Sequence, residues 1–202
     1  MATLTPSRPS LFTLPNQLTA ARLVLSIILF TLIAAGWWLT CIWVFAAAAI
    51  TDWLDGYFAR RHGSSSSLGR VFDPLVDKVL ICGAFIFLLA APGRGGLEPW
   101  MVTIVVAREL IITGLRSFLE NRGVQFGADW LGKLKMGLQC AALFGIFASL
   151  YGEQINNTAL FTIDLLVLRD GLNYAMVGAT AISGLQYLWK AAWILPASGS
   201  EP

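Results

Sequence analysis

Four aspartates in the first half of the chain have a spacing that could hold metal ions. Asp52 and Asp55 lie three residues apart at the end of one apolar stretch, and Asp73 and Asp77 lie four residues apart at the start of the next. Offsets of three and four residues place side chains on one face of an α-helix. The spacing therefore predicts two helical faces that each carry a pair of carboxylates.

Small residues are interleaved with these aspartates. Gly56 and Ala59 share the first predicted face, and Gly69 shares the second. Because these residues have almost no side chain, they leave room for a flat or phosphorylated ligand against the backbone. The connection between the two stretches, residues 62–68, is short and polar. It favours antiparallel neighbouring helices whose aspartate faces are opposed.

Carboxylates gathered in this way would repel one another. A hard divalent cation removes that repulsion, and oxygen-only ligands suit Mg²⁺ or Mn²⁺. Two metal ions held by shared carboxylates recur in enzymes that catalyse displacement at phosphorus. The alternative is that the aspartates form interfacial caps or ion pairs, and that the small residues form a helix-packing face.

The helices that carry these residues are predicted to cross a membrane. Of the 202 residues, 56% are hydrophobic and 13% are charged, and the mean hydropathy is +0.68. Soluble domains typically carry about 25% charged residues. A bilayer core of about 30 Å needs roughly 20 apolar residues per helix. Six stretches approach or exceed that length, at 18–35, 37–60, 70–92, 98–118, 134–152 and 172–193.

The expected fold is all-α, a polytopic integral membrane protein with a single catalytic domain over 18–193. Residues 1–17 form an N-terminal segment, and 194–202 form a C-terminal tail. Residues 158–168 are apolar but short and run into Leu168-Arg169-Asp170-Gly171, so we expect a re-entrant or interfacial piece there. A net charge of +2 without a basic run argues against a nucleic-acid partner.

The positions of Lys and Arg predict the orientation in the bilayer. With the N-terminus inside, ten basic residues fall at the cytoplasmic ends of the stretches, whereas the opposite side keeps Arg94 and Arg169. Such a bias follows the positive-inside rule. We therefore expect both termini and the aspartates to face the cytoplasm.

The aspartates belong to a longer pattern. Residues 52–77 read D-x-x-D-G-x-x-A-R-x8-G-x-x-x-D-x-x-x-D, which resembles the signature of the CDP-alcohol phosphotransferases without departure in residue or spacing. The resemblance implies an integral-membrane, six-helix, usually dimeric enzyme. Such an enzyme moves a phosphatidyl or related group from a CDP-linked donor to an alcohol and releases CMP.

The resemblance also implies roles for individual residues. Asp77 would deprotonate the acceptor hydroxyl, in addition to binding metal. Two divalent ions, Mg²⁺ or Mn²⁺, would be held by Asp52, Asp55, Asp73 and Asp77. The pocket for CDP-diacylglycerol would be lined by Asn16, Thr19, Gly56, Ala59, Arg60, Ser66 and Gly69. For Asn16 and Thr19 the alternative is a polar helix N-terminus.

Three further segments, 16–22, 107–116 and 130–135, are similar to bacterial members of the family whose acceptor is glycerol 3-phosphate. A phosphate dianion needs a basic pocket, and guanidinium groups suit bidentate phosphate contacts. The expected pocket residues are Arg108, Arg116, Lys133 and Lys135. The last three could instead be ordinary positive-inside anchors. Glu109 is a candidate for orienting one of these cations.

The resemblance therefore implies transfer of a phosphatidyl group from CDP-diacylglycerol to glycerol 3-phosphate, which gives phosphatidylglycerophosphate and CMP. The enzyme would be a homodimer in the bacterial cytoplasmic membrane. Inositol phosphate or serine could replace glycerol 3-phosphate as acceptor. Acidic residues at membrane depth also mark ion pathways, so a divalent cation carrier is a further alternative. The clustering of the acids at one interface argues against a carrier.

Overall fold

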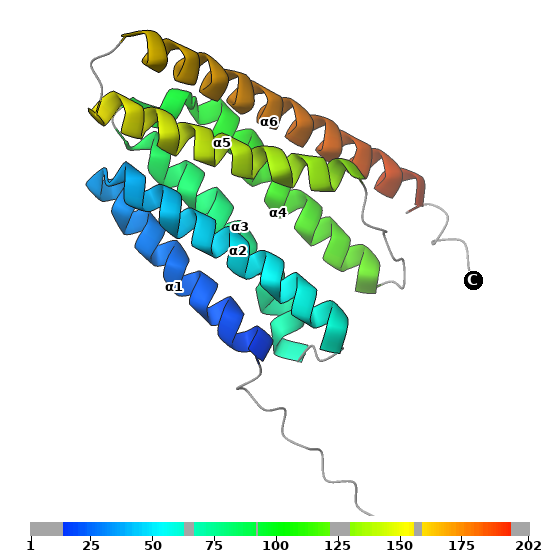
Figure 1. Cartoon of the computed structure of the whole chain (residues 1–202). Helices are drawn as coiled ribbons and strands as arrows, with labels where there is room; N and C mark the ends of the chain where they lie inside the picture. Colours follow the sequence, from blue (N-terminus) through cyan, green and yellow to red (C-terminus); the bar gives the residue numbers. More distant parts are fainter. Residues whose placement is uncertain (1–13, 63–66, 92, 122–129, 156–158, 195–202) are drawn as a thin grey trace, which may run out of the picture.

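The computed structural model of the chain describes residues 14–62, 67–91, 93–121, 130–155 and 159–194, but no side chain from Asp52 to Pro74. Every regular element in these ranges is helical (Figure 1). The elements are α1 (Leu14–Ala35), α2 (Trp38–His62), α3 (Ser67–Leu89), the short 3₁₀ helix η1 (Arg94–Gly96), α4 (Pro99–Asn121), α5 (Trp130–Ile155) and α6 (Ala159–Ile194). The predicted all-α fold is confirmed, and each predicted stretch coincides largely with one α-helix.

Glycine and proline mark two of the helix boundaries. α1 ends before Gly36, which has a φ of 72° and donates its backbone N–H to the Ile33 carbonyl at 3.1 Å. A positive φ is common in the residue that follows a helix, and glycine adopts it without a steric penalty. α4 begins at Pro99, where the missing N–H would have had no intrahelical partner.

Successive helices run in alternating directions, so the end of α2, the start of α3 and the start of α5 lie at the same end of the bundle (Figure 1). We call this the signature end. α1 packs against α2 and α3, α4 against α3 and α6, and α5 against α2 and α6.

The expected packing of the two aspartate faces falls largely on side chains outside the described ones. In the part of the chain that the structure describes, α2 and α3 make no direct contact, and α1 packs against both of them. The connection 63–66 still holds the joined ends of α2 and α3 within about 18 Å, because four residues cannot span more. Face-to-face packing along α2 and α3 is therefore not found in their described parts.

Aromatic and aliphatic side chains fill the space between the helices. Phe45 on α2 meets Phe144 and Phe147 on α5 edge to face, with ring centroids 4.9 and 6.0 Å apart. Phe30 on α1 stacks on Phe87 of α3, with ring centroids 4.9 Å apart. In lipid, close packing of this kind is a main force that holds helices together.

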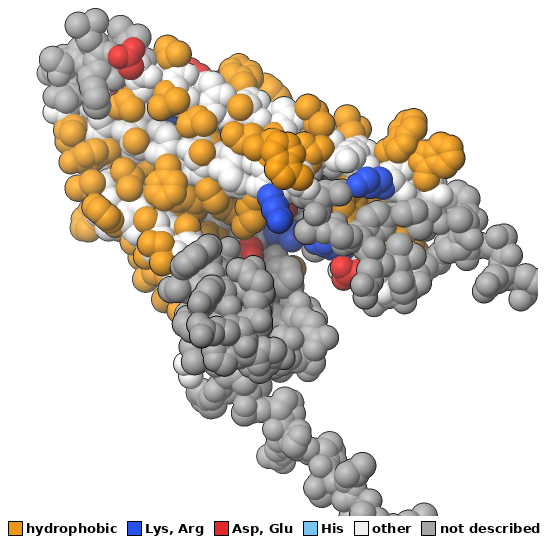
Figure 2. Space-filling view, turned by 45° about the vertical axis from the view of Figure 1, so that its right-hand side comes forward, with side chains coloured by type: hydrophobic (Ala, Val, Ile, Leu, Met, Phe, Trp, Pro, Cys, Tyr) orange, Lys and Arg blue, Asp and Glu red, His pale blue; other side chains and the backbone are white. Residues whose placement is uncertain are grey.

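Large apolar side chains also cover the outside of the bundle. Trp43, Leu110 and Leu185, on three different helices, are 69%, 65% and 68% exposed. Figure 2 shows hydrophobic side chains over most of one face, with the visible Lys and Arg side chains mainly in one part of it. A surface this apolar is suited to contact with lipid. By length and hydropathy of the described residues, α5 alone is a full membrane span, and shorter apolar runs occupy Thr19–Ala35 and Trp38–Thr51.

The expectation of a separate interfacial piece at 158–168 is wrong. From Ala159 onward this segment is the first part of α6, which continues to Ile194 over 36 residues. At 1.5 Å per residue the helix is about 54 Å long, well beyond the thickness of a bilayer core. The charges at Arg169 and Asp170 do not interrupt it, because Arg169 Nε donates to Asp170 Oδ1 at 2.9 Å. Gly171 costs only about 1 kcal/mol in a helix interior.

A tight turn at η1 closes the end of the bundle opposite the signature end. Gly95 has a φ of 55° and packs against Ile146 of α5. The side-chain amide of Asn173 on α6 donates to the Gly95 carbonyl at 3.1 Å. This turn therefore connects α3 and α4 to the α5–α6 pair, and it helps to set how α4 approaches α5 and α6.

Gly95→Ala should destabilise the protein by roughly 2–4 kcal/mol, because a Cβ at a positive φ is strained and would overlap Ile146. Gly178→Ala is the matched control, since nothing lies within 4 Å of the position that its new methyl group would take on α6. That variant should be as stable as the parent or slightly more so. Thermal unfolding of the detergent-solubilised proteins compares them, and equal losses in both variants would contradict the role of the η1 turn.

Candidate active site

The signature aspartates lie on α2 and α3, close to the ends that the short connection joins. Asp52 and Asp55 are in the last part of α2, whereas Asp73 and Asp77 are in the first half of α3. Asp77 is the one whose side chain is described. The side chains of the other three aspartates are not described. The same holds for most residues predicted to line the donor pocket, namely Asn16, Gly56, Ala59, Arg60 and Gly69, and Ser66 lies outside the described residues.

Asp77 is held by an arginine from α1. Arg22 Nη1 forms an ion pair with Asp77 Oδ1. The Arg22 side chain is 2% exposed and that of Asp77 is 29% exposed, so the guanidinium is enclosed while the carboxylate stays accessible. Thr19, one turn before Arg22, is also buried. The contact places the start of α1 against the second half of the signature, and the donor-pocket role of Thr19 stays a prediction.

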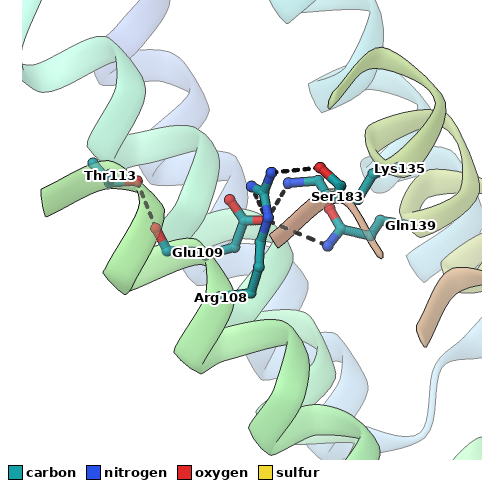
Figure 3. A network of polar contacts seen from close by, with 6 residues as sticks. All are labelled: Arg108, Glu109, Thr113, Lys135, Gln139 and Ser183. Carbon is teal, nitrogen blue, oxygen red and sulfur yellow. Dashed lines mark hydrogen bonds and ion pairs between the residues drawn. The ribbon is translucent and has the colours of Figure 1, made fainter. Parts of the chain in front are cut away.

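A second polar cluster joins α4, α5 and α6, and we call it the buried network (Figure 3). Lys135 Nζ contacts Glu109 Oε1, and Arg108 Nη1 lies 3.4 Å from the same oxygen. Gln139 Nε2 donates to this oxygen at 3.5 Å, which is a weak bond. Arg108 Nη2 donates to Ser183 Oγ at 2.8 Å. Glu109 is thus the acceptor on which three donors from two helices converge.

The buried network carries more positive than negative charge. Among the described side chains it contains the cations of Arg108 and Lys135 against one carboxylate, that of Glu109. A buried excess of positive charge is costly unless an anion compensates it. The network is therefore suited to bind an anionic group.

The structure separates the four cations predicted to bind the acceptor phosphate. Arg108 and Lys135 meet in the buried network. Arg116 pairs instead with Glu120, one turn further along α4, at 3.3 Å, and both side chains are about half exposed. Lys133 is also exposed. Arg108 and Lys135 thus form a buried inner pair, whereas Arg116 and Lys133 form an exposed outer pair.

Sequence reasoning missed Ser183 and Gln139, and for Arg22 it left open contact with the donor headgroup or an interfacial arginine, without indicating Asp77 as its partner. Ser183 lies in the last third of the chain, which carries no recognisable motif. A signal is nevertheless present there, because Asn173, Thr180 and Ser183 are buried polar residues at offsets of seven and three. A polar stripe of that periodicity on an otherwise apolar helix marks a face directed into the bundle.

Comparison with known proteins gives these groups a context. A family description, CDP-alcohol phosphatidyltransferase, matches residues 12–169. The chain belongs to this family. The CDP-alcohol phosphatidyltransferases are membrane enzymes that generally use divalent metal ions. The match includes all four signature aspartates, the segment with Arg22, and the α4 and α5 residues of the buried network.

Individual family members are similar over most of their length. A protein of Bacillus subtilis (strain 168) is 31% identical over 196 residues, which is 89% of this chain and 95% of the relative. Proteins of Shigella flexneri and Salmonella typhi are 31% identical over 178 and 174 residues, 81% of this chain and 93% of each relative. All three are named CDP-diacylglycerol–glycerol-3-phosphate 3-phosphatidyltransferase.

The donor set of the signature fits the metal ions that the family uses. Four carboxylates offer only oxygen ligands, which hard divalent cations prefer. The described carboxylate, that of Asp77, remains partly exposed and therefore accessible to an ion. Among the described side chains no group of three or more acidic, His or Cys residues is found, since three of the four aspartates fall outside them.

Glu109→Gln should destabilise the protein by about 3–5 kcal/mol, because it removes a carboxylate that compensates two buried cations. Glu120→Gln, on the same helix, breaks the exposed pair with Arg116 and should change stability by less than about 1 kcal/mol. Thermal unfolding in detergent measures both. If Glu109→Gln destabilised the protein no more than Glu120→Gln does, the buried network would not contribute to stability as its geometry indicates.

Proposed function

We propose that the chain transfers the phosphatidyl group of CDP-diacylglycerol to glycerol 3-phosphate, which yields phosphatidylglycerophosphate and CMP. One observation carries this proposal: a chain with the family signature also has a buried network in which two cations, Arg108 and Lys135, share one carboxylate. An acceptor that has its own phosphate needs such a network, and the names of the relatives agree with it.

The donor binds at the signature end. The four aspartates hold two divalent ions, Mg²⁺ or Mn²⁺, which when bound neutralise charge on the diphosphate and on the departing CMP. Arg60 contacts the diphosphate. The small residues of the signature leave space for the nucleotide, and Asn16 and Thr19 contact it from α1. The acyl chains of the donor stay in the bilayer, which contacts the apolar outer surface of the bundle.

The acceptor phosphate binds to Arg108 and Lys135, which are charge-assisted donors in a water-poor environment. In the absence of substrate, Glu109 compensates these two cations and keeps their side chains in place. Arg116 and Lys133 lie outside the network and are exposed, where they attract the dianion from solution. Ser183 fixes the orientation of the Arg108 guanidinium.

The transfer is a direct displacement in which Asp77 acts as general base. Asp77 accepts the proton of the acceptor 1-hydroxyl while that oxygen bonds to the phosphorus of the phosphatidyl group. The bond from this phosphorus to the bridging oxygen breaks, and its electron pair stays on CMP. Holding both substrates in line supplies much of the acceleration. The enzyme acts at the cytoplasmic face of the bacterial inner membrane as a homodimer.

An acceptor assay tests the function directly. Purified full-length protein, given CDP-diacylglycerol and Mg²⁺ or Mn²⁺, should convert labelled glycerol 3-phosphate into a lipid-soluble product and release an equal amount of CMP. Chelation of the metal, or Asp77→Asn, should abolish this reaction, whereas CDP-diacylglycerol binding by Asp77→Asn persists.

Two results would contradict the proposal. Use of labelled serine or inositol phosphate in place of glycerol 3-phosphate would assign another acceptor. Divalent-ion flux into proteoliposomes without CDP-lipid, together with no release of CMP, would indicate a cation carrier.

Arg108→Gln and Lys135→Gln should each raise KM for glycerol 3-phosphate by about 10–100-fold, since each removes a charged hydrogen bond worth roughly 1.5–3 kcal/mol. KM for CDP-diacylglycerol should change by less than about threefold, because the donor binds elsewhere. Lys133→Gln is the comparison on the same helix as Lys135. Its side chain is exposed, so the same KM should rise by no more than about threefold. Equal effects of Lys133→Gln and Lys135→Gln would contradict the inner position of Lys135.

A further inference from the structure

Arg108 makes few polar contacts for an arginine inside a helical bundle. A guanidinium offers five N–H donors in a rigid, planar arrangement. Nη2 donates to Ser183 Oγ at 2.8 Å, whereas Nη1 lies 3.4 Å from Glu109 Oε1, which is long for a hydrogen bond. The Arg108 Nε atom is buried, and no described acceptor lies within hydrogen-bond distance of it. Within the described part of the chain, Ser183 therefore supplies the one short hydrogen bond of Arg108.

The group that holds Arg108 is neutral. The carboxylate of Glu109 is in closer contact with Lys135 than with Arg108. A hydroxyl can fix a guanidinium by a hydrogen bond without cancelling its charge, whereas a carboxylate in the same place would form an ion pair with it. A hydroxyl partner therefore leaves the positive charge of Arg108 available to an anionic ligand.

α6 also fixes the aliphatic part of the Arg108 side chain. A Cβ at Gly184, the residue after Ser183, would lie only 3.1 Å from Arg108 Cγ, so the side chain passes close to the α6 backbone there. Figure 3 shows the end of Arg108 directed at the Ser183 hydroxyl. Two adjacent residues of α6 thus set the position of Arg108, one at its stem and one at its guanidinium.

We propose that Ser183 is a positioning residue that holds Arg108 for the acceptor phosphate and must itself be uncharged. This inference rests on the proposed function, in which Arg108 binds that phosphate. A neutral acceptor of the Arg108 hydrogen bond at position 183 supports phosphate binding, whereas an anion there takes the place of the phosphate. Position 183 lies beyond the matched range 12–169, so the choice of a phosphorylated acceptor depends on α6 as well as on the family segment.

Two substitutions of nearly equal size test the requirement for a neutral group. Asp and Asn at position 183 can both accept the hydrogen bond from Arg108 and differ mainly in charge. Steady-state kinetics of the full-length protein in lipid nanodiscs give KM for glycerol 3-phosphate. Ser183→Asp should have a KM at least about 30-fold higher than Ser183→Asn, with KM for CDP-diacylglycerol within about threefold in both. Ser183→Asp should unfold at no lower temperature than Ser183→Asn, because the added carboxylate pairs with Arg108.

Removal of the hydroxyl tests whether Ser183 acts through Arg108. Ser183→Ala should raise KM for glycerol 3-phosphate by about 3–10-fold, with kcat and KM for CDP-diacylglycerol within about twofold. In an Arg108→Gln background the same substitution should change this KM by less than about twofold. Thr180→Val is the matched control. Thr180 is buried one turn before Ser183, and its hydroxyl has no hydrogen-bond partner among the described residues, so this variant should keep the KM of the parent.

Three results would overturn this proposal alone, provided that the parent uses glycerol 3-phosphate. Equal KM values for Ser183→Asp and Ser183→Asn would show that charge at position 183 does not affect phosphate binding. An equal effect of Ser183→Ala with and without Arg108 would show that Ser183 does not act through this arginine. An effect of Thr180→Val as large as that of Ser183→Ala would indicate a general disturbance of α6. If the parent used serine and not glycerol 3-phosphate, the proposed function would fail, and this inference with it.

Discussion

A charge inside a helical bundle that is surrounded by lipid must have a partner, because the free energy of an unpaired ion there is prohibitive. In this protein the partners come from different helices. Arg22 joins α1 to α3, Lys135 and Glu109 join α5 to α4, and Arg169 joins α6 to Glu153 on α5 at 3.7 Å. These pairs restrict which helices can be neighbours and in what register, whereas apolar packing alone would allow many arrangements.

The same pairs place the groups that we assign to catalysis. Glu109 holds Lys135 and Arg108 together before any substrate is present, so a phosphate meets a preformed pocket. Arg22 likewise holds Asp77 before a metal ion binds. Preorganisation of this kind lowers the cost of ordering side chains during binding. It also means that a variant which weakens a pair changes both stability and chemistry.

Much of the fold could be predicted from the chain, because membrane thickness sets the length of an apolar helix. Each predicted stretch coincides with a helix, but one expectation is wrong. Leu168-Arg169-Asp170-Gly171 predicts the end of a segment, yet α6 continues through it because Arg169 and Asp170 pair with each other and Arg169 with Glu153. Residues 62–68 predict opposed aspartate faces on α2 and α3, which stays a prediction, whereas α1 packs against the described parts of both helices. Local polarity and loop length do not reveal these distant partners.

The sequence alone determined the aspartate signature, the helices that carry it and the resemblance to the family, since all of these depend on residue types at short, fixed spacings. Only the tertiary structure decided which cations share a site. Arg108 and Lys135 meet through Glu109 while Arg116 stays at the surface, and Ser183 arrives from 75 residues away. Arg22 reaches Asp77 across 55 residues. Such pairings depend on how helices pack, and helical periodicity shows which face of a helix is buried but not which residue lies opposite.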